Sequence, residues 1–101
     1  FKDLNVDVIH IEFANRNMHE IELWEKHGGD KVLCAGVIDV KGRSLEPVEV
    51  VADRIRTCLR YCAADKLWVA PDCGFSQTPR NLSVLKMRAM VEAARTVRET
   101  L

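Results

Sequence analysis

Acidic side chains and a thiol stand at the ends of three apolar runs in this sequence. Glu12 lies near the end of the first run, Asp39 ends the second, and the pair Asp72-Cys73 follows the third. A carboxylate oxygen and a thiolate are both zinc ligands, at about 2.0–2.3 Å from the metal. Glu12 and Cys73 are therefore candidate ligands of one metal ion. On spacing alone, a solvated glutamate and a small buried thiol are the favoured interpretation, because no C-x-x-C or H-x-x-x-H pair accompanies them.

Strands and helices alternate along the chain, and these elements must position the candidate residues. Apolar and β-branched segments predict three strands, and the segments between and after them predict three helices. The predicted strands cover 7–13, 32–39 and 67–71, and the predicted helices cover 17–26, 47–63 and 81–100. Three consecutive βα units indicate an α/β fold with a parallel sheet. The carboxyl ends of parallel strands share one edge, so Glu12, Asp39 and Cys73 are expected to meet there.

Local signals support the helices and assign their faces. Asn17 and Glu20 resemble a capping box, and Pro47 suits a first helical turn. One face of the second helix is expected to pack on the core through Val48, Val51, Ile55, Leu59 and Cys62. The third helix is expected to do so through Val84, Met87, Val91 and Ala94.

Other polar and aromatic residues have simpler interpretations. Cys34, Cys58 and Cys62 are expected in the core. His10 shares the strand parity of Glu12, which favours a satisfied core histidine and leaves open a partner of a metal ligand. Both tryptophans, Trp24 and Trp68, are expected in core or helix–sheet contacts, and His19 and His27 on the surface. Charged residues that predict solvated helix faces are Asp53, Arg54, Arg56, Arg60, Arg88, Glu92, Arg95, Arg98 and Glu99.

Composition restricts the class of protein. The chain has 101 residues, of which 48% are hydrophobic, and its 15 basic and 15 acidic side chains give a formal net charge of zero. This balance argues against a nucleic-acid or anionic-membrane surface. No apolar run approaches the ~20 residues that span a bilayer, and no signal peptide is visible. The four cysteines are interpreted as reduced thiols of a cytoplasmic protein.

Three stretches carry a resemblance that covers nearly the whole chain. They are "DVIHIEF" with "NRNMHEIELWE", "GVIDVKGRSLEPVEVVADRIRTCL", and "LWVAPDCGF" with "MVEAARTVR". Together they resemble the C-terminal catalytic barrel of cobalamin-independent methionine synthase, and the "LWVAPDCG" element is the most specific. The resemblance implies that residues 1–101 form a single partial-barrel domain, the last three βα units of a TIM (β/α)8 barrel.

The resemblance also implies a zinc centre. In the family, zinc is held by a histidine and a cysteine of an H-x-C motif, a glutamate, and a later cysteine. The glutamate matches Glu12 and the later cysteine matches Cys73, whereas the sequence contains no H-x-C motif. The chain is therefore expected to supply two of four zinc ligands, and to bind zinc weakly when isolated.

The implied reaction is methyl transfer to the thiol of homocysteine, which forms methionine. Zinc holds that thiol as a thiolate, and the family's donor is the N5-methyl group of a tetrahydrofolate. The departing amine needs a proton. Where the folate-dependent enzymes have D-x-H-S-P, this chain has Asp39 followed by Val40 and Lys41. Asp39 and Lys41 are thus the expected catalytic residues, although a lysine with a pKa near 10.4 is a weaker acid than histidine.

Lys41 leaves other donors and reactions open. A methylated corrinoid is an alternative methyl donor, and the opening of an epoxide by a coenzyme thiol is an alternative zinc-dependent alkyl transfer. A third alternative is an inert scaffold fragment. The isolated chain is expected to be inactive, and to associate with itself or with the missing part of the barrel, since bare strand edges invite pairing.

Overall fold

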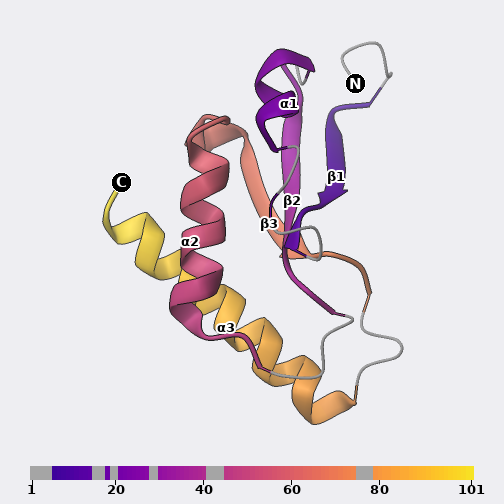
Figure 1. Ribbon diagram of the computed structural model, residues 1–101, viewed down its shortest axis with the longest axis vertical. Helices are drawn as coiled ribbons and strands as arrows, with labels where there is room; N and C mark the ends of the chain where they lie inside the picture. The colour runs from indigo at the N-terminus through magenta and orange to yellow at the C-terminus, as the bar shows by residue number, and fades with distance from the viewer. Residues whose placement is uncertain (1–5, 15–17, 19–20, 28–29, 41–44, 75–78) are drawn as a thin grey trace.

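The computed structural model describes residues 6–14, 18, 21–27, 30–40, 45–74 and 79–101. Strands and helices alternate in the predicted order (Figure 1). The elements are β1 (Val8–Glu12), α1 (Ile21–His27), β2 (Val32–Ile38), α2 (Val48–Leu59), a short 3-10 helix η2 (Ala64–Lys66), β3 (Leu67–Pro71) and α3 (Arg80–Glu99). The three strands and α3 each begin and end within one residue of the predicted bounds.

The three strands form one parallel sheet in the order β1-β2-β3. Across the sheet, Ile11 pairs with Ala35 and Ala35 with Val69. One residue further along, Glu12 pairs with Gly36 and Gly36 with Ala70. The register shifts between Gly36 and Ile38, at the carboxyl end of β2. The prediction of an α/β fold with a parallel sheet is confirmed.

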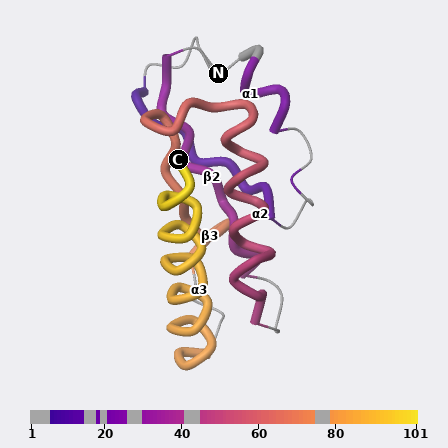
Figure 2. Tube along the Cα trace, turned by 90° about the vertical axis from the view of Figure 1, so that its left-hand side faces the viewer, coloured from indigo at the N-terminus to yellow at the C-terminus, as the bar shows by residue number. Residues whose placement is uncertain are grey.

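The helices cover one face of the sheet. Helices α2 and α3 pack against each other along that face (Figures 1 and 2). Helix α1 adds two buried side chains, Ile21 and Trp24, to the same core. Alternate strand residues point into this layer because side chains in a strand alternate between faces. Leu33 and Ala35 belong to the buried core, and the partly buried strand residues packed against it include Ile9, Ile11, Leu67 and Val69.

The opposite face of the sheet, which we call the open face, has no helix over it in the described part of the chain. It presents the row His10, Cys34 and Trp68 and then the row Glu12, Gly36 and Ala70. Trp68 is 56% exposed and His10 is also exposed, so the predictions of a core tryptophan and a core histidine are wrong here. Cys34 is only half-buried, for the same reason. Trp24, by contrast, is buried as predicted.

Helix α3 faces the core with a different stripe from the predicted one. Val84, Met87 and Val91 are each at least 38% exposed, and Ala94 is half-buried. The buried stripe consists of Lys86, Ala89, Met90, Ala93 and Val97. Both stripes have helical spacing, so periodicity does not choose between them. The buried stripe was not recognised in the sequence because it contains Lys86, and lysine is rarely buried without a partner.

Helix α2 buries the predicted face, through Val51, Ile55 and their partly buried neighbours. It ends at Leu59 rather than near residue 63. The N–H groups of Arg60 and Tyr61 donate to the carbonyls three residues before them, and such bonds tighten and end the last turn. Within the described residues, no helix combines the length and apolarity that a membrane span requires. The predicted capping pair Asn17 and Glu20, together with His19, lies outside the described residues.

Candidate functional site

The predicted site residues lie at the carboxyl edge of the sheet, at the lower ends of the strands in Figure 1. Glu12 is the last residue of β1 and is half-buried, and Asp39 directly follows β2. Cys73 is the second residue after β3 and is exposed. Strands β1 and β3 flank β2, so their axes are about 10 Å apart, two strand spacings. The structure thus brings Glu12, Asp39 and Cys73 to one edge.

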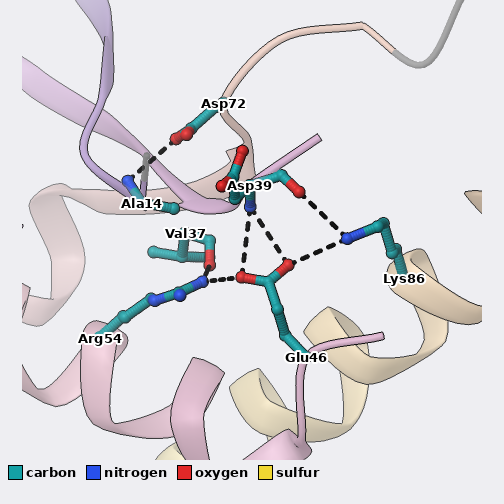
Figure 3. A network of polar contacts seen from close by, with 7 residues as sticks. All are labelled: Ala14, Val37, Asp39, Glu46, Arg54, Asp72 and Lys86. Atoms are coloured by element: carbon teal, nitrogen blue, oxygen red, sulfur yellow. Dashed lines mark hydrogen bonds and ion pairs between the residues drawn. The ribbon is translucent and has the colours of Figure 1, made fainter. Parts of the chain in front are cut away.

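Asp72 joins the segments that carry the two candidate ligands. It is 2% exposed, and its Oδ1 accepts a hydrogen bond from the Ala14 N–H over 3.1 Å (Figure 3). Its own N–H donates to the carbonyl of Ile38 over 2.8 Å. The residue before Cys73 is therefore tied to the segment that follows Glu12, and to the end of the strand between them.

Gly36 leaves space for the Asp72 side chain that makes this hydrogen bond to Ala14. A Cβ atom at Gly36 would lie 2.4 Å from Asp72 Oδ1, 2.8 Å from its Cα and 3.2 Å from the carbonyl oxygen of Ile11. Real side chains do not approach so closely, so any larger residue displaces Asp72. The sequence did contain a signal, since a glycine inside a strand often marks the close approach of another backbone.

His10 supports the same segment from the open face. Its Nε2 lies 3.0 Å from the carbonyl oxygen of Pro71, which is 61 residues away in the chain. The imidazole of β1 thereby contacts the end of β3, next to Asp72. This contact corrects the expectation of a core histidine, because the imidazole is exposed and its Nε2 faces a backbone carbonyl.

A second network holds the backbone of Asp39 (Figure 3). The Asp39 N–H lies 3.2 and 3.3 Å from the two carboxylate oxygens of Glu46, and the Asp39 carbonyl accepts from Lys86 Nζ over 3.0 Å. Lys86 Nζ also pairs with Glu46 Oε1 at 3.2 Å. Arg54 pairs with the other Glu46 oxygen and donates to the carbonyl of Val37 over 2.8 Å.

Sequence reasoning missed this network. Arg54 was predicted to lie on a solvated helix face, yet its side chain is only 19% exposed. Glu46 and Lys86 were not singled out, and their side chains are 13% and 0% exposed. Lys41, the other predicted catalytic residue, lies outside the described residues.

The environments of the cysteines distinguish Cys73 from the others. Burial, and secondarily the nearby Cys62, raises the pKa of the Cys58 thiol to about 12. Burial also raises the pKa of Cys34 and of Cys62, although a hydrogen bond from Trp24 partly offsets the rise at Cys62. All three thiols therefore stay protonated near neutral pH, which makes them poor nucleophiles and metal ligands. Cys73 is the exposed cysteine, and it is the one at the carboxyl edge.

The described residues contain no group of three or more His, Cys, Asp or Glu side chains that could hold a metal ion together. A carboxylate at Glu12 and a thiol at Cys73 fit the donor chemistry of zinc, but a structural or catalytic zinc site needs at least three protein ligands. Within the described part of the chain, the two candidates thus form at most part of a metal centre.

Comparison with known proteins identifies the family of this chain. Residues 1–96 match the family described as Cobalamin-independent synthase, Catalytic domain. A methionine synthase from Saccharolobus islandicus is 43% identical over 99 residues, which are 98% of this chain and 30% of that protein. A methionine synthase from Saccharolobus solfataricus is 41% identical over 101 residues, again 30% of its length. The chain thus spans about 30% of the length of these curated relatives.

A solved structure also matches the fold. It is a B12-independent methionine synthase from Shewanella sp. W3-18-1 in complex with selenomethionine, with a TM-score of 0.88 and 33% identity. The match covers 95% of this chain and 28% of that one. Sequence and structure agree, and the chain belongs to the family of cobalamin-independent synthase catalytic domains.

Proposed function

We propose that this chain is the C-terminal part of a zinc-dependent methyltransferase that methylates the thiol of homocysteine and forms methionine. The observation that carries the proposal is the convergence of Glu12, Asp39 and Cys73 at one edge of the sheet, in a chain of this family. Two relatives are methionine synthases, and the Shewanella structure holds selenomethionine, the selenium analogue of the expected product.

Glu12 and Cys73 are the proposed zinc ligands in this chain. The free, exposed thiol of Cys73 and the half-buried carboxylate of Glu12 support this, as does the tie between their segments through Asp72. The remaining ligands would come from an H-x-C motif elsewhere in the full-length protein. Bound zinc would hold the homocysteine sulfur as a thiolate near neutral pH.

Asp39 and Lys41 are the proposed catalytic residues. The amine that leaves when a methyl group is transferred from a methyltetrahydrofolate must gain a proton. Lys41 stands two residues after Asp39, in the position where the resemblance expects a proton-donating histidine. In this proposal Lys41 delivers the proton and the Asp39 carboxylate orients the donor or that lysine.

We propose that the full-length catalytic domain is a (β/α)8 barrel containing these three βα units. The open face of the sheet, with Trp68 and His10 exposed on it, supports this, since the interior of such a barrel is filled by side chains of all strands. The four free cysteines support a reducing, cytoplasmic location.

The test is the activity of a full-length protein that contains this chain. It is expected to convert homocysteine to methionine with methyltetrahydrofolate or a methylated corrinoid as donor, and to contain about one zinc ion per chain. Product is measured by mass spectrometry and metal by atomic absorption. Turnover of an epoxide with a coenzyme thiol, without methionine formation, would instead establish the alternative alkyl transfer that Lys41 leaves open.

The isolated chain of 101 residues is expected to self-associate. The outer edges of β1 and β3 have no partner strand within the described residues, and bare edges invite pairing. Helix α3 also exposes apolar side chains around a surface hollow of about 610 Å³, which is lined by Ser83, Val84, Met87, Arg88, Val91 and Glu92. Sedimentation equilibrium is the measurement, and Val91→Glu, which places a charge on this exposed face, should reduce association. A clean monomer at high concentration would contradict the prediction.

A further inference from the structure

Lys86 is an unusual residue to find inside this core. It lies in the buried stripe of α3 with Ala89 and Met90, and its side chain is fully buried. Among the described residues, Lys86 and Asp72 are the buried charged side chains. An apolar residue of similar volume often serves stability as well as a buried ion pair does. A lysine at this position therefore suggests that its ammonium group has a specific structural role.

The ammonium group of Lys86 fixes the backbone at Asp39, the residue that directly follows β2. Lys86 Nζ donates to the Asp39 carbonyl over 3.0 Å, and Glu46, which pairs with Lys86, accepts from the Asp39 N–H. Both polar groups of one backbone residue are thus engaged, from two different elements (Figure 3). Arg54 completes the set, since it pairs with Glu46 and donates to the carbonyl of Val37, two residues upstream of Asp39.

The charges of Glu46, Arg54 and Lys86 strengthen these contacts to the backbone of Asp39. Two cations, Arg54 and Lys86, flank one carboxylate, Glu46, and all three side chains are at most 19% exposed. Electrostatic interactions are stronger where water is excluded, so this arrangement resists displacement. The backbone of Asp39 is therefore held where its carboxylate lies at the carboxyl edge, with Glu12 and Cys73.

We infer that Glu46 and Lys86 are positioning residues that set the place of the Asp39 carboxylate for methyl transfer. The inference rests on the proposed function, because it takes Asp39 as catalytic. Neither residue needs to touch substrate. Both act through the backbone of Asp39, and a displacement of about 1 Å there is enough to cost up to 100-fold in rate.

The test is a double-mutant cycle in the full-length protein that contains this chain. Lys86→Met keeps the length of the side chain and removes its charge, and is expected to lower kcat by about 10- to 100-fold. The KM for the thiol and the zinc content should stay unchanged. Hydrogen exchange at the Asp39 amide should become faster. In an Asp39→Asn background, Lys86→Met should have little further effect on kcat, because the carboxylate that it positions is gone.

Arg95→Met is the matched control. Arg95 lies on the same helix and pairs with Glu92 at 3.0 Å, but its side chain is 63% exposed. Its replacement should change neither kcat nor exchange at Asp39. If Lys86→Met fails to fold, Glu46→Gln replaces it in the same cycle. Glutamine keeps the size of Glu46 and an acceptor for the Asp39 N–H but lacks the charge.

The outcomes separate this inference from the proposed function. A kcat equal to the parental value in a folded Lys86→Met or Glu46→Gln variant, with Asp39→Asn impaired, overturns the positioning role alone. Equal losses with and without the Asp39 carboxylate also overturn it, since they show a general structural role. Parental activity of Asp39→Asn refutes the role of Asp39 itself, and hence the catalytic part of the proposed function.

Discussion

Cys73→Ser is expected to remove most of the bound zinc from the full-length protein and to lower methyl transfer by about 100-fold or more. Replacement of a residue that merely supports a metal ligand typically costs 10- to 100-fold in affinity or activity, so loss of a ligand should cost at least as much. Serine is nearly the same size as cysteine but is not a zinc ligand of comparable strength. Zinc content by atomic absorption and competition with a chelator are the direct measurements, and kcat is the second.

Cys62→Ser is the matched control for this experiment. The Cys62 thiol is half-buried and donates to the Lys66 carbonyl over 3.3 Å, a hydrogen bond that a serine hydroxyl can keep. Burial raises its pKa, so it is not available as a thiolate near neutral pH. Zinc content and kcat should stay at the parental values.

Glu12→Gln tests the other proposed ligand. The amide keeps the shape of Glu12 and loses its negative charge, so zinc affinity should fall here as well. Stoichiometric, tightly bound zinc in both Glu12→Gln and Cys73→Ser would rule out the assignment of these two residues as ligands. The family membership of the chain would be unaffected, because it rests on the comparisons rather than on the metal.

The fold was largely predictable because its signals are local. Each strand is a short apolar run, and each run is followed by a segment of helical period, so the βα alternation follows from the order of residues. Parallel pairing follows from that alternation. The bounds of β3 are correct because Pro71 and Asp72 end its apolar run sharply. The end of α2 was predicted too late in the chain. Its last N–H groups donate to carbonyls three residues back instead of four, and this change has no clear signature in the residue types.

Which face of an element is buried was less predictable. Helix α3 has two apolar stripes, and the exposed one contains Val84 and Met87, which look more like core residues than Lys86 does. The lysine is tolerated because Glu46 and the Asp39 carbonyl satisfy its ammonium group. Trp68 was misplaced for a related reason, since an apolar strand residue gives no sign that its face lacks a covering layer among the described residues.

The position of the candidate site could be predicted from the sequence, but the hydrogen bonds that hold its residues in place could not. Glu12, Asp39 and Cys73 were found because each ends a strand, and parallel strands bring their ends together. The contacts that hold them join residues far apart in the chain. Asp72 reaches Ala14 across 58 residues, and Lys86 reaches Asp39 across 47. No local pattern specifies such pairs, so they appear only once the elements are placed in space.

Gly36→Ala is expected to destabilise the fold by about 2 kcal/mol and to weaken zinc binding at the same time. The new methyl group would overlap the Asp72 carboxylate, which is 2.4 Å away, and also its backbone Cα at 2.8 Å. Overpacking of this kind typically costs 1–3 kcal/mol. Movement of Asp72 would also break its hydrogen bond to the buried Ala14 N–H, and an unsatisfied buried donor adds to the cost.

Gly74→Ala is the control, two residues further along the chain from Asp72. A Cβ atom at Gly74 meets nothing within 4 Å, so this substitution should leave stability nearly unchanged. The comparison uses the midpoint of thermal unfolding of the full-length protein, with and without added zinc. Equal midpoints for the two alanine variants would contradict the packing of Asp72 over Gly36.

A second substitution separates steric overlap from loss of the hydrogen bond. Asp72→Ala alone removes the acceptor for Ala14 N–H and should destabilise by about 1–3 kcal/mol. In the double variant Gly36→Ala/Asp72→Ala the overlap with the carboxylate is gone, whereas the contact with the Asp72 Cα remains. The double variant should therefore lose less stability than the sum of the two single changes. Zinc affinity should fall in all three variants, because Asp72 ties the segment of Cys73 to that of Glu12 and each substitution loosens this tie.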